Sequence, residues 1–194
     1  MRSAIILLSL VAASGCGHLA SRSLESFLDV HYVLGQDEAW RLNGPYECRQ
    51  VVSPTTICIV RNGEVVKTTL RGCLSTRNAE MDSQCLRVLS KLDDSGIASV
   101  GAYLRSDSTA KDSSNSLKTV VYHPANRVFV GKDAQGNFQF ENLTYVCPQM
   151  LAIAQGYCLV DHSDTDYPLY DVFRQLEDLA RKARRGYWGT IENP

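Results

Sequence analysis

The feature that most constrains the fold of this chain is a periodic stretch near its C-terminus, residues 166–189. Apolar residues recur there at intervals of three and four, which is the spacing of one helix face. They are Leu169, Val172, Phe173, Leu176, Leu179, Ala180 and Ala183. Asp166 stands at the position of an N-cap, Gly186 ends the pattern, and the pair Glu177–Arg181 lies on the opposite, charged face. The sequence therefore predicts a long amphipathic helix that packs one face against a domain.

The composition is that of a folded globular domain. Of the 194 residues, 44% are hydrophobic and 21% are charged, which is not the composition of a disordered chain. The formal net charge is −1, which gives no electrostatic reason to expect broad binding to nucleic acid. We therefore expect one domain with additional terminal segments, and no nucleic-acid partner.

The N-terminus has the pattern of an export signal. Arg2 precedes an apolar run at residues 4–13 that is too short to span a membrane. The run ends in A-S-G-C at residues 13–16, which resembles a bacterial lipobox, the motif whose cysteine is acylated. Ala13 stands where Leu is usual, so cleavage by the ordinary signal peptidase remains the alternative. A lipid on Cys16 would hold the protein on a membrane surface, and we expect the bacterial cell envelope, facing the periplasm or the outside, with the outer membrane preferred.

Export changes how the cysteines are interpreted. Besides Cys16 the chain has Cys48, Cys58, Cys73, Cys85, Cys147 and Cys158. An even number of cysteines in an exported chain favours disulfides, and their grouping predicts the pairs Cys48–Cys58, Cys73–Cys85 and Cys147–Cys158, with other connectivities open. A metal site is the alternative, but no C-x-x-C spacing exists and the histidines are scattered. We expect no metal.

Alternating and periodic segments predict the remaining elements. Strands are expected at 46–52, 56–61, 65–70, 97–104, 117–122, 128–132 and 157–160, and helices at 78–92 and 148–155. Asn62-Gly63 is the strongest hairpin turn because both residues tolerate positive φ, and the Ser/Asp-rich residues 105–116 predict an exposed loop. Short strands with helices between them favour an α+β fold, in which a small five-stranded barrel carries packed helices.

The C-terminal residues also carry a family resemblance. Residues 180–188 read A-R-K-A-R-R-G-Y-W and come after a short strand-like run, G-Y-C-L-V, at 156–160. This segment resembles the last helix of the staphylococcal nuclease (thermonuclease) family, and the resemblance extends roughly over residues 46–188. It implies an oligonucleotide-binding (OB) type barrel. The expected organisation is a signal peptide with its lipidation cysteine at 1–16, a tether at 17–45, the domain at 46–189 and a tail at 190–194.

The resemblance implies an active site in which carboxylates hold Ca²⁺, a glutamate activates water and two arginines clamp the phosphate. The family motif D-G-D-T falls on residues 53–56, which read S-P-T-T, and R-L-x-G-I-D-x-P-E falls on residues 69–77, which read T-L-R-G-C-L-S-T-R. The carboxylates of both motifs are therefore missing. In the third motif, Y-G-R, the arginine is retained as Arg127.

The residues at the individual motif positions also indicate a site without catalytic groups. Thr69 replaces the first arginine, Leu74 an aspartate and Arg77 the glutamate. We expect a pocket around these three residues together with Thr55 and Arg127. Without its carboxylates, the pocket has no predicted catalytic residue.

Neighbouring residues could substitute only in a remodelled site. Arg71 lies two residues beyond Thr69, about 6.6 Å along a strand, too far for an unaltered phosphate clamp. Glu80 and Asp82 fall on the next helix and are expected to be surface charges. If the protein were an enzyme, the site would be Arg127, Arg71, Glu80 and Asp82, with Ca²⁺ as the cofactor.

No other catalytic arrangement stands out. The chain has no G-x-S-x-G motif. His162, in the acid-rich run 161–166, is expected to be an exposed loop histidine without a hydrolytic partner. We expect Trp40 to lie in the core and Trp188 to act as a cap.

These patterns leave three functional hypotheses. The first is a membrane-anchored, non-catalytic binding or scaffold component of an envelope assembly, such as secretion or conjugation machinery, with residues 17–43 and 105–116 as contact candidates. The second is an exported Ca²⁺-dependent nuclease with a remodelled site. The third, binding of single-stranded nucleic acid, is disfavoured because the strands carry few aromatic residues beside a basic groove.

Overall fold

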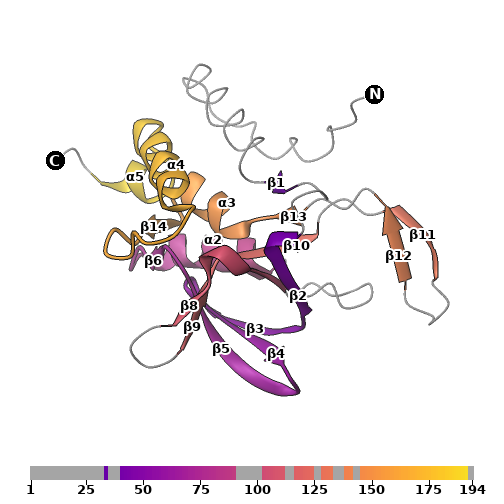
Figure 1. Ribbon diagram of the computed structural model, residues 1–194. Helices are drawn as coiled ribbons and strands as arrows, with labels where there is room; N and C mark the ends of the chain where they lie inside the picture. The colour runs from indigo at the N-terminus through magenta and orange to yellow at the C-terminus, as the bar shows by residue number, and fades with distance from the viewer. Residues whose placement is uncertain are drawn as a thin grey trace.

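The computed structural model describes residues 33–34, 40–90, 102–111, 116–124, 128–132, 138–141 and 145–191. In these residues the protein is a mixed α+β fold with several sheets and a helical C-terminal region, as predicted (Figure 1). The expected signal peptide, Cys16 and Arg127 lie outside the described residues. In the described part of the chain, no helix is long and apolar enough to cross a membrane.

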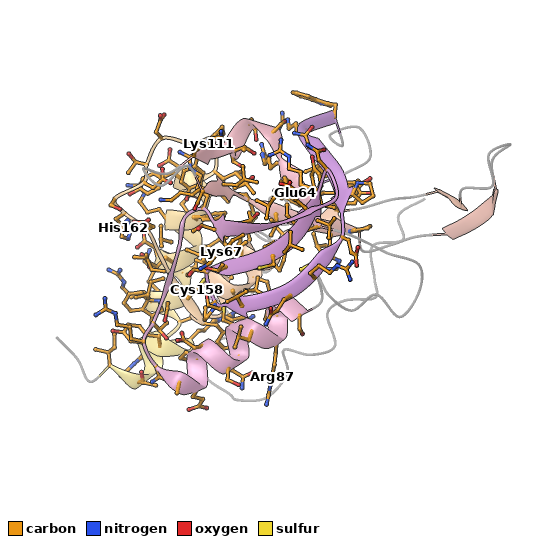
Figure 2. The ribbon with its side chains drawn as sticks, turned by 90° about the horizontal axis from the view of Figure 1, so that it is seen from below. Glu64, Lys67, Arg87, Lys111, Cys158 and His162 are labelled. Atoms are coloured by element: carbon orange, nitrogen blue, oxygen red, sulfur yellow. The ribbon has the colours of Figure 1, made fainter. Side chains whose placement is uncertain are left out.

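A three-stranded meander confirms the strongest local prediction. Strands β3 (Cys48–Ser53), β4 (Thr56–Arg61) and β5 (Glu64–Leu70) pair in sequence order. The β4–β5 register runs without interruption from Thr56↔Thr69 to Arg61↔Glu64. Asn62 and Gly63 connect the strands with φ of 53° and 79°, the conformation that their side chains were expected to permit. Figure 2 labels Glu64, at the start of β5 directly after this turn, and Lys67, further along the strand; both side chains are exposed.

The meander belongs to one of two five-stranded sheets, ordered β3-β4-β5-β9-β8 and β1-β13-β10-β7-β2. The other strands are β1 (Val33–Leu34), β2 (Leu42–Tyr46), β7 (Ala102–Arg105), β8 (Ala110–Lys111), β9 (Leu117–Thr119), β10 (Val121–Pro124) and β13 (Tyr145–Val146). Only Val120 separates β9 from β10, and only Glu47 separates β2 from β3. Residues 106–109 likewise connect β7 to β8, so three continuous stretches of chain pass from one sheet into the other.

Smaller elements complete the strand set. Strands β11 (Val128–Lys132) and β12 (Phe138–Glu141) form an antiparallel pair, and β6 (Cys73–Ser75) pairs antiparallel with β14 (Cys158–Val160). The only parallel contact among the described strands joins β5 to β9.

Helix α2 (Ala79–Leu89) begins with a side-chain cap. Oδ1 of Asn78 accepts hydrogen bonds from the backbone N–H groups of Glu80 and Met81, at 3.0 and 3.2 Å. Met81, Cys85 and Leu89 are buried, which is one helical face. A helix was predicted at residues 78–92, and the described helix ends at Leu89.

Helix α3 (Pro148–Ala154) lies at the centre of the helical region. Six of its seven residues are buried, and it contacts both α2 and α4 (Tyr170–Lys182). The short helix α5 (Tyr187–Thr190) comes after α4, and Figure 1 shows both on the side of the molecule that carries β14. The interior is formed where these helices meet the sheets, with Tyr122, Phe173, Met150 and Ile153 fully buried.

The C-terminal helix differs from its prediction at two points. Phe173, Leu176 and Ala180 are buried as expected, but α4 begins at Tyr170, and Asp166 lies in the preceding loop without a capping role. Glu177, expected on the charged face, is only 2% exposed. The reason is that the N–H of Val160 and the ring of His162 supply hydrogen bonds that helix periodicity cannot reveal.

Two further predictions need correction. Residues 105–116 were expected to be an exposed loop, and Ser106, Asp107, Thr109 and Lys111 are exposed, but Arg105 and Ser108 are buried. Residues 112–115 lie outside the described residues. The Ser108 hydroxyl accepts a hydrogen bond from the N–H of Val120, which anchors this segment to the strand beside it. Trp40 was expected in the core but is 74% exposed, with the guanidinium of Arg41 over its ring.

Candidate functional site

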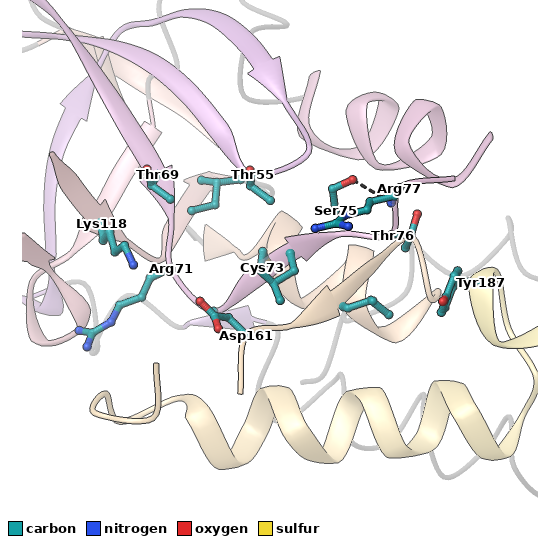
Figure 3. A pocket seen from close by; sticks show the side chains of 14 residues that line it. Thr55, Thr69, Arg71, Cys73, Ser75, Thr76, Arg77, Lys118, Asp161 and Tyr187 are labelled. Carbon is teal, nitrogen blue, oxygen red and sulfur yellow. Dashed lines mark hydrogen bonds between the residues drawn. The ribbon is translucent and has the colours of Figure 1, made fainter. Parts of the chain in front are cut away.

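A pocket of about 590 Å³ opens where the end of β5 meets β6, β9, β14 and α5. Its lining residues are Thr55, Thr69, Leu70, Arg71, Gly72, Cys73, Leu74, Ser75, Thr76, Arg77, Lys118, Leu159, Asp161 and Tyr187. Figure 3 shows their side chains on strands that come from distant parts of the sequence. The pocket is therefore a product of the tertiary fold.

The pocket contains most of the positions that the sequence analysis had placed together. Thr55, Thr69, Leu74 and Arg77 all line it. Arg127, the fifth expected member, lies outside the described residues. The two threonines and the leucine offer hydroxyl groups and an apolar surface where carboxylates would be needed for a cation.

The charge of the pocket is mainly positive. Its only carboxylate is that of Asp161, against the cations Arg71, Arg77 and Lys118. The Asp161 carboxylate accepts hydrogen bonds from the N–H and the hydroxyl of Ser163, at 3.0 and 2.6 Å. Figure 3 shows Asp161 and Lys118 on the same side of the pocket.

Arg71 is held by the fold. Its Nε and Nη2 donate to the two carboxylate oxygens of Asp164, each at 2.9 Å. Nη1 donates to the carbonyl of Ser108 at 3.0 Å, and Nη2 also donates to the carbonyl of Asp166 at 2.6 Å. Arg71 is 7% exposed. Its guanidinium points away from the other labelled side chains (Figure 3), and four of its five N–H groups bind Asp164, Asp166 and Ser108, so its main role is to tie the turn after β5 to these two segments.

The environment of Asp164 supports this structural role for Arg71. The hydrogen bonds from Arg71 hold the pKa of the Asp164 carboxyl below its ordinary value, against the opposing effect of partial burial. The charges of Arg71 and Lys118 act in the same direction. The carboxylate is therefore ionised, and paired, at neutral pH.

Arg77 and Lys118 are the cations that face the cavity. Across the described ranges, neither side chain forms an ion pair. Arg77 is exposed and has φ of 58°, a left-handed conformation that is unusual for an arginine. Its N–H donates to the Ser75 hydroxyl at 3.0 Å, which helps to hold the turn. The pocket can therefore attract an anionic group through these two side chains.

The acidic residues proposed for a remodelled site do not reach the pocket. Asp82 accepts hydrogen bonds from the hydroxyls of Ser75 and Thr76, at 2.8 and 3.3 Å, so it shapes the segment between β6 and α2. Glu80 is exposed in the first turn of α2. Neither lines the cavity with Arg71.

The residues of this pocket do not fit a Ca²⁺ ion. Calcium takes six to eight oxygen ligands, usually with several carboxylates among them. One carboxylate and three cationic residues line the pocket, and within the described parts of the chain no group of three His, Cys, Asp or Glu residues is placed to hold a metal.

The six cysteines of the domain lie in the described residues, and no two of their sulfurs are at bonding distance. The closest approach is between Cys73 and Cys158, whose Sγ atoms are 3.7 Å apart. The sequence-based pairs Cys48–Cys58, Cys73–Cys85 and Cys147–Cys158 stay predictions.

Sequence reasoning missed a polar cluster beside the pocket. Oε2 of Glu177 lies 2.9 Å from Nε2 of His162, and Nδ1 of His162 lies 3.1 Å from the Tyr170 hydroxyl. Oε1 of Glu177 accepts the N–H of Val160 at 2.9 Å. His162 is half exposed, as a loop histidine should be, but its partners come from α4. No sequence spacing signals this arrangement, because the helix and the loop meet only after folding.

The buried amide of Gln149 was missed as well. Its Oε1 accepts the N–H of Val121 at 2.6 Å, and its Nε2 donates to the carbonyl of Arg71 at 2.9 Å. This side chain joins α3 to β10 and to the pocket wall. A polar residue in the otherwise apolar run of α3 is the only signal that could have indicated it.

Comparison with known proteins does not assign the chain to a family. The chain matches no protein-family model. No curated protein resembles it closely enough to count as a relative.

Proposed function

We propose that this protein is a non-catalytic binding module of the bacterial cell envelope, held on a membrane by a lipid on Cys16. The observation that carries the proposal is the pocket, which has a single carboxylate, Asp161, and two cations that face the cavity, Arg77 and Lys118. A hydrolytic phosphodiester site of the Ca²⁺ type needs the opposite charge distribution, because the metal must be held before it can polarise the phosphate. We therefore favour a function in which the protein binds other molecules without cleaving them.

We further propose that the domain is a divergent OB-type barrel related to the staphylococcal nucleases. The stretches that pass between the two sheets support this, β2–β3, β7–β8 and β9–β10. The N–H of Val60 donates to the carbonyl of Glu47 at 2.9 Å, and the N–H of Arg105 donates to the carbonyl of Val120 at 2.9 Å. These bonds extend the β3–β4 and β7–β10 ladders as far as the residues at which the chain changes sheet, and chain that is shared between sheets in this way is a property of small barrels.

The pocket favours a partner with an acidic group. Arg77 and Lys118 present cationic donors, and the hydroxyls of Thr55, Thr69 and Ser75 lie along the same wall. Inorganic phosphate is a suitable probe for this property. Phosphate in the millimolar range should perturb the amide NMR signals of residues 69–77, and the double change Arg77→Ala with Lys118→Ala should abolish the effect. Arg87→Ala, on the exposed face of α2, is the matched control.

The non-catalytic assignment is tested with Ca²⁺ and nucleic acid. The wild-type protein should neither cleave DNA or RNA nor change its thermal midpoint in millimolar Ca²⁺. Cleavage that stops on addition of a chelator would establish the rival function, an exported nuclease that uses a remodelled site.

A gain-of-function variant tests the relationship to the nuclease fold separately. Thr55→Asp combined with Leu74→Asp places two carboxylates at the positions that the family motifs assign to metal ligands. We expect this variant, and not the wild type, to gain thermal stability with Ca²⁺. A folded variant without any Ca²⁺ response would contradict the proposed equivalence of positions.

The anchor is tested independently of the domain. Metabolic labelling with a radioactive fatty acid should mark the wild-type chain, and Cys16→Ala should remove the label. A wild-type chain that is secreted without label would disprove lipidation and leave the pocket argument intact.

A further inference from the structure

Three thiols meet behind the wall of the pocket. Cys73 lies on β6, Cys158 on β14 and Cys85 on α2, and all three are buried. Figure 2 shows Cys158 in the interior of the molecule, far in sequence from the other two. The Sγ atoms of Cys73 and Cys158 are 3.7 Å apart, and the Cys85 thiol donates to the carbonyl of Pro54 at 3.8 Å.

The strand register explains why Cys73 and Cys158 approach each other. Cys73 lies opposite Val160, and Cys158 lies opposite Ser75. The two cysteines are therefore offset by two residues across an antiparallel pair, which places their side chains on the same face as diagonal neighbours. The pairing of β6 with β14 thus brings the two side chains to one face. Diagonal neighbours stand further apart than directly opposed cysteines, so closing the bond requires a small shift of the two strands.

Two other thiols could pair with Cys158. Cys85 contacts Cys158, and its thiol also reaches the Pro54 carbonyl at 3.8 Å. Cys147, the predicted partner of Cys158, is fully buried. The 3.7 Å distance between the Sγ atoms of Cys73 and Cys158, together with the access to Cys73 from the pocket, favours the pair Cys73–Cys158 over both.

We propose that Cys73 and Cys158 form a disulfide that ties β6 to β14. Cys73 lines the pocket, whereas Cys158 does not, so a small disulfide enters at Cys73. The Cys73 thiolate attacks one sulfur of glutathione disulfide, which releases one glutathione. The Cys158 thiolate then attacks the Cys73 sulfur of the mixed disulfide and releases the second glutathione. Two protein thiols lose two electrons and two protons, and one glutathione disulfide is reduced to two thiols.

The pairing has a consequence for the pocket. β6 carries Leu74 and Ser75 on the lining, and β14 carries Leu159. These strands form a sheet of only two strands, so backbone hydrogen bonds alone connect them edge to edge. A covalent bond across a span of 85 residues constrains the unfolded chain strongly and holds both walls at a fixed separation.

The test is peptide mapping of the full chain, without reducing agent, after incubation of the reduced folded protein with glutathione disulfide. The inference rests on geometry and does not depend on the proposed function. We expect one linked peptide pair that joins Cys73 to Cys158. We also expect the thermal midpoint to rise by at least about 5 °C relative to the reduced protein.

Serine variants provide the matched controls. Cys85→Ser should leave the Cys73–Cys158 link intact, and Cys73→Ser should abolish it. Peptides that link Cys73 to Cys85 or Cys147 to Cys158 would overturn the proposal, as would a wild-type protein that stays fully reduced. The wild-type map decides the question even if a variant fails to fold.

Discussion

Two arginines of the same pocket wall have opposite environments. Arg71 is 7% exposed and is held by Asp164 and by two backbone carbonyls. Arg77 is exposed, forms no ion pair within the described chain, and has positive φ. Both are counted equally in a net charge. The charge that a pocket offers to a ligand therefore depends on which of its cations the fold has already neutralised.

The difference arises from the segment of chain that comes after each residue. After Arg71 the chain turns through Gly72, and the loop 161–169 packs directly against that turn. After Arg77 the chain enters α2, which is exposed in its first turn. The same side chain is therefore a structural link in one place and a potential ligand contact in the other.

The largest loss of stability is expected from a substitution at Gly72, next to Arg71. A Cβ at this position would overlap the Tyr167 hydroxyl and come within 2.8 Å of the Phe173 ring, at φ of 78°. Gly72→Ala should cost about 4 kcal/mol or prevent folding, because overpacking and backbone strain add. Urea unfolding measures this. Gly63→Ala is the control, since φ is similarly positive at 79° and nothing lies within 4 Å, so it should cost only about 1 kcal/mol.

The next effect separates the two arginines directly. Arg71→Met should destabilise the protein by about 3 kcal/mol, because the Asp164 carboxylate loses its partner in a largely buried site. Arg77→Met should change the free energy of unfolding by less than about 0.5 kcal/mol. If chemical denaturation gave the same loss in the free energy of unfolding for both variants, the two environments would not differ energetically.

The pH dependence of stability should depend on the Asp164 carboxyl. Its pKa in the folded protein is lowered, so its stabilising effect is present above the ordinary pKa and is lost as the pH falls through the folded value. Asp164→Asn should therefore cost about 1–2 kcal/mol at pH 7, and the difference from wild type should shrink towards pH 3. Parallel urea titrations across this range measure it, and a difference that is independent of pH would contradict the assignment.

The smallest expected effect is a gain in stability when Arg77 is replaced by glycine. Glycine adopts positive φ without strain, so Arg77→Gly should raise the free energy of unfolding by about 0.5–1 kcal/mol. Arg77→Ala keeps the backbone strain while removing the charge, and it should give no gain. If both variants behaved alike in thermal melts, the charge and not the backbone would be responsible.

The fold was predictable where local chemistry decides it. Asn62-Gly63 marked the β4–β5 turn, Asn78 marked the start of α2, and the buried face of α4 was expected from periodicity. The positions 55, 69, 74 and 77 could be placed together only through a family resemblance, and all four line one pocket. The burial of Glu177 could not be predicted, because the N–H of Val160 and the ring of His162 reach it from outside its own helix.

The sequence alone determined helix α2, the buried face of α4 and the β4–β5 hairpin, since each depends on residues that are close along the chain. Only the tertiary structure decided which charges are neutralised and which sulfurs are neighbours. Asp164 reaches Arg71 across 93 residues, and Cys158 reaches Cys73 across 85. Contacts over such separations depend on strand pairing and helix packing, which bring together groups that no local pattern relates.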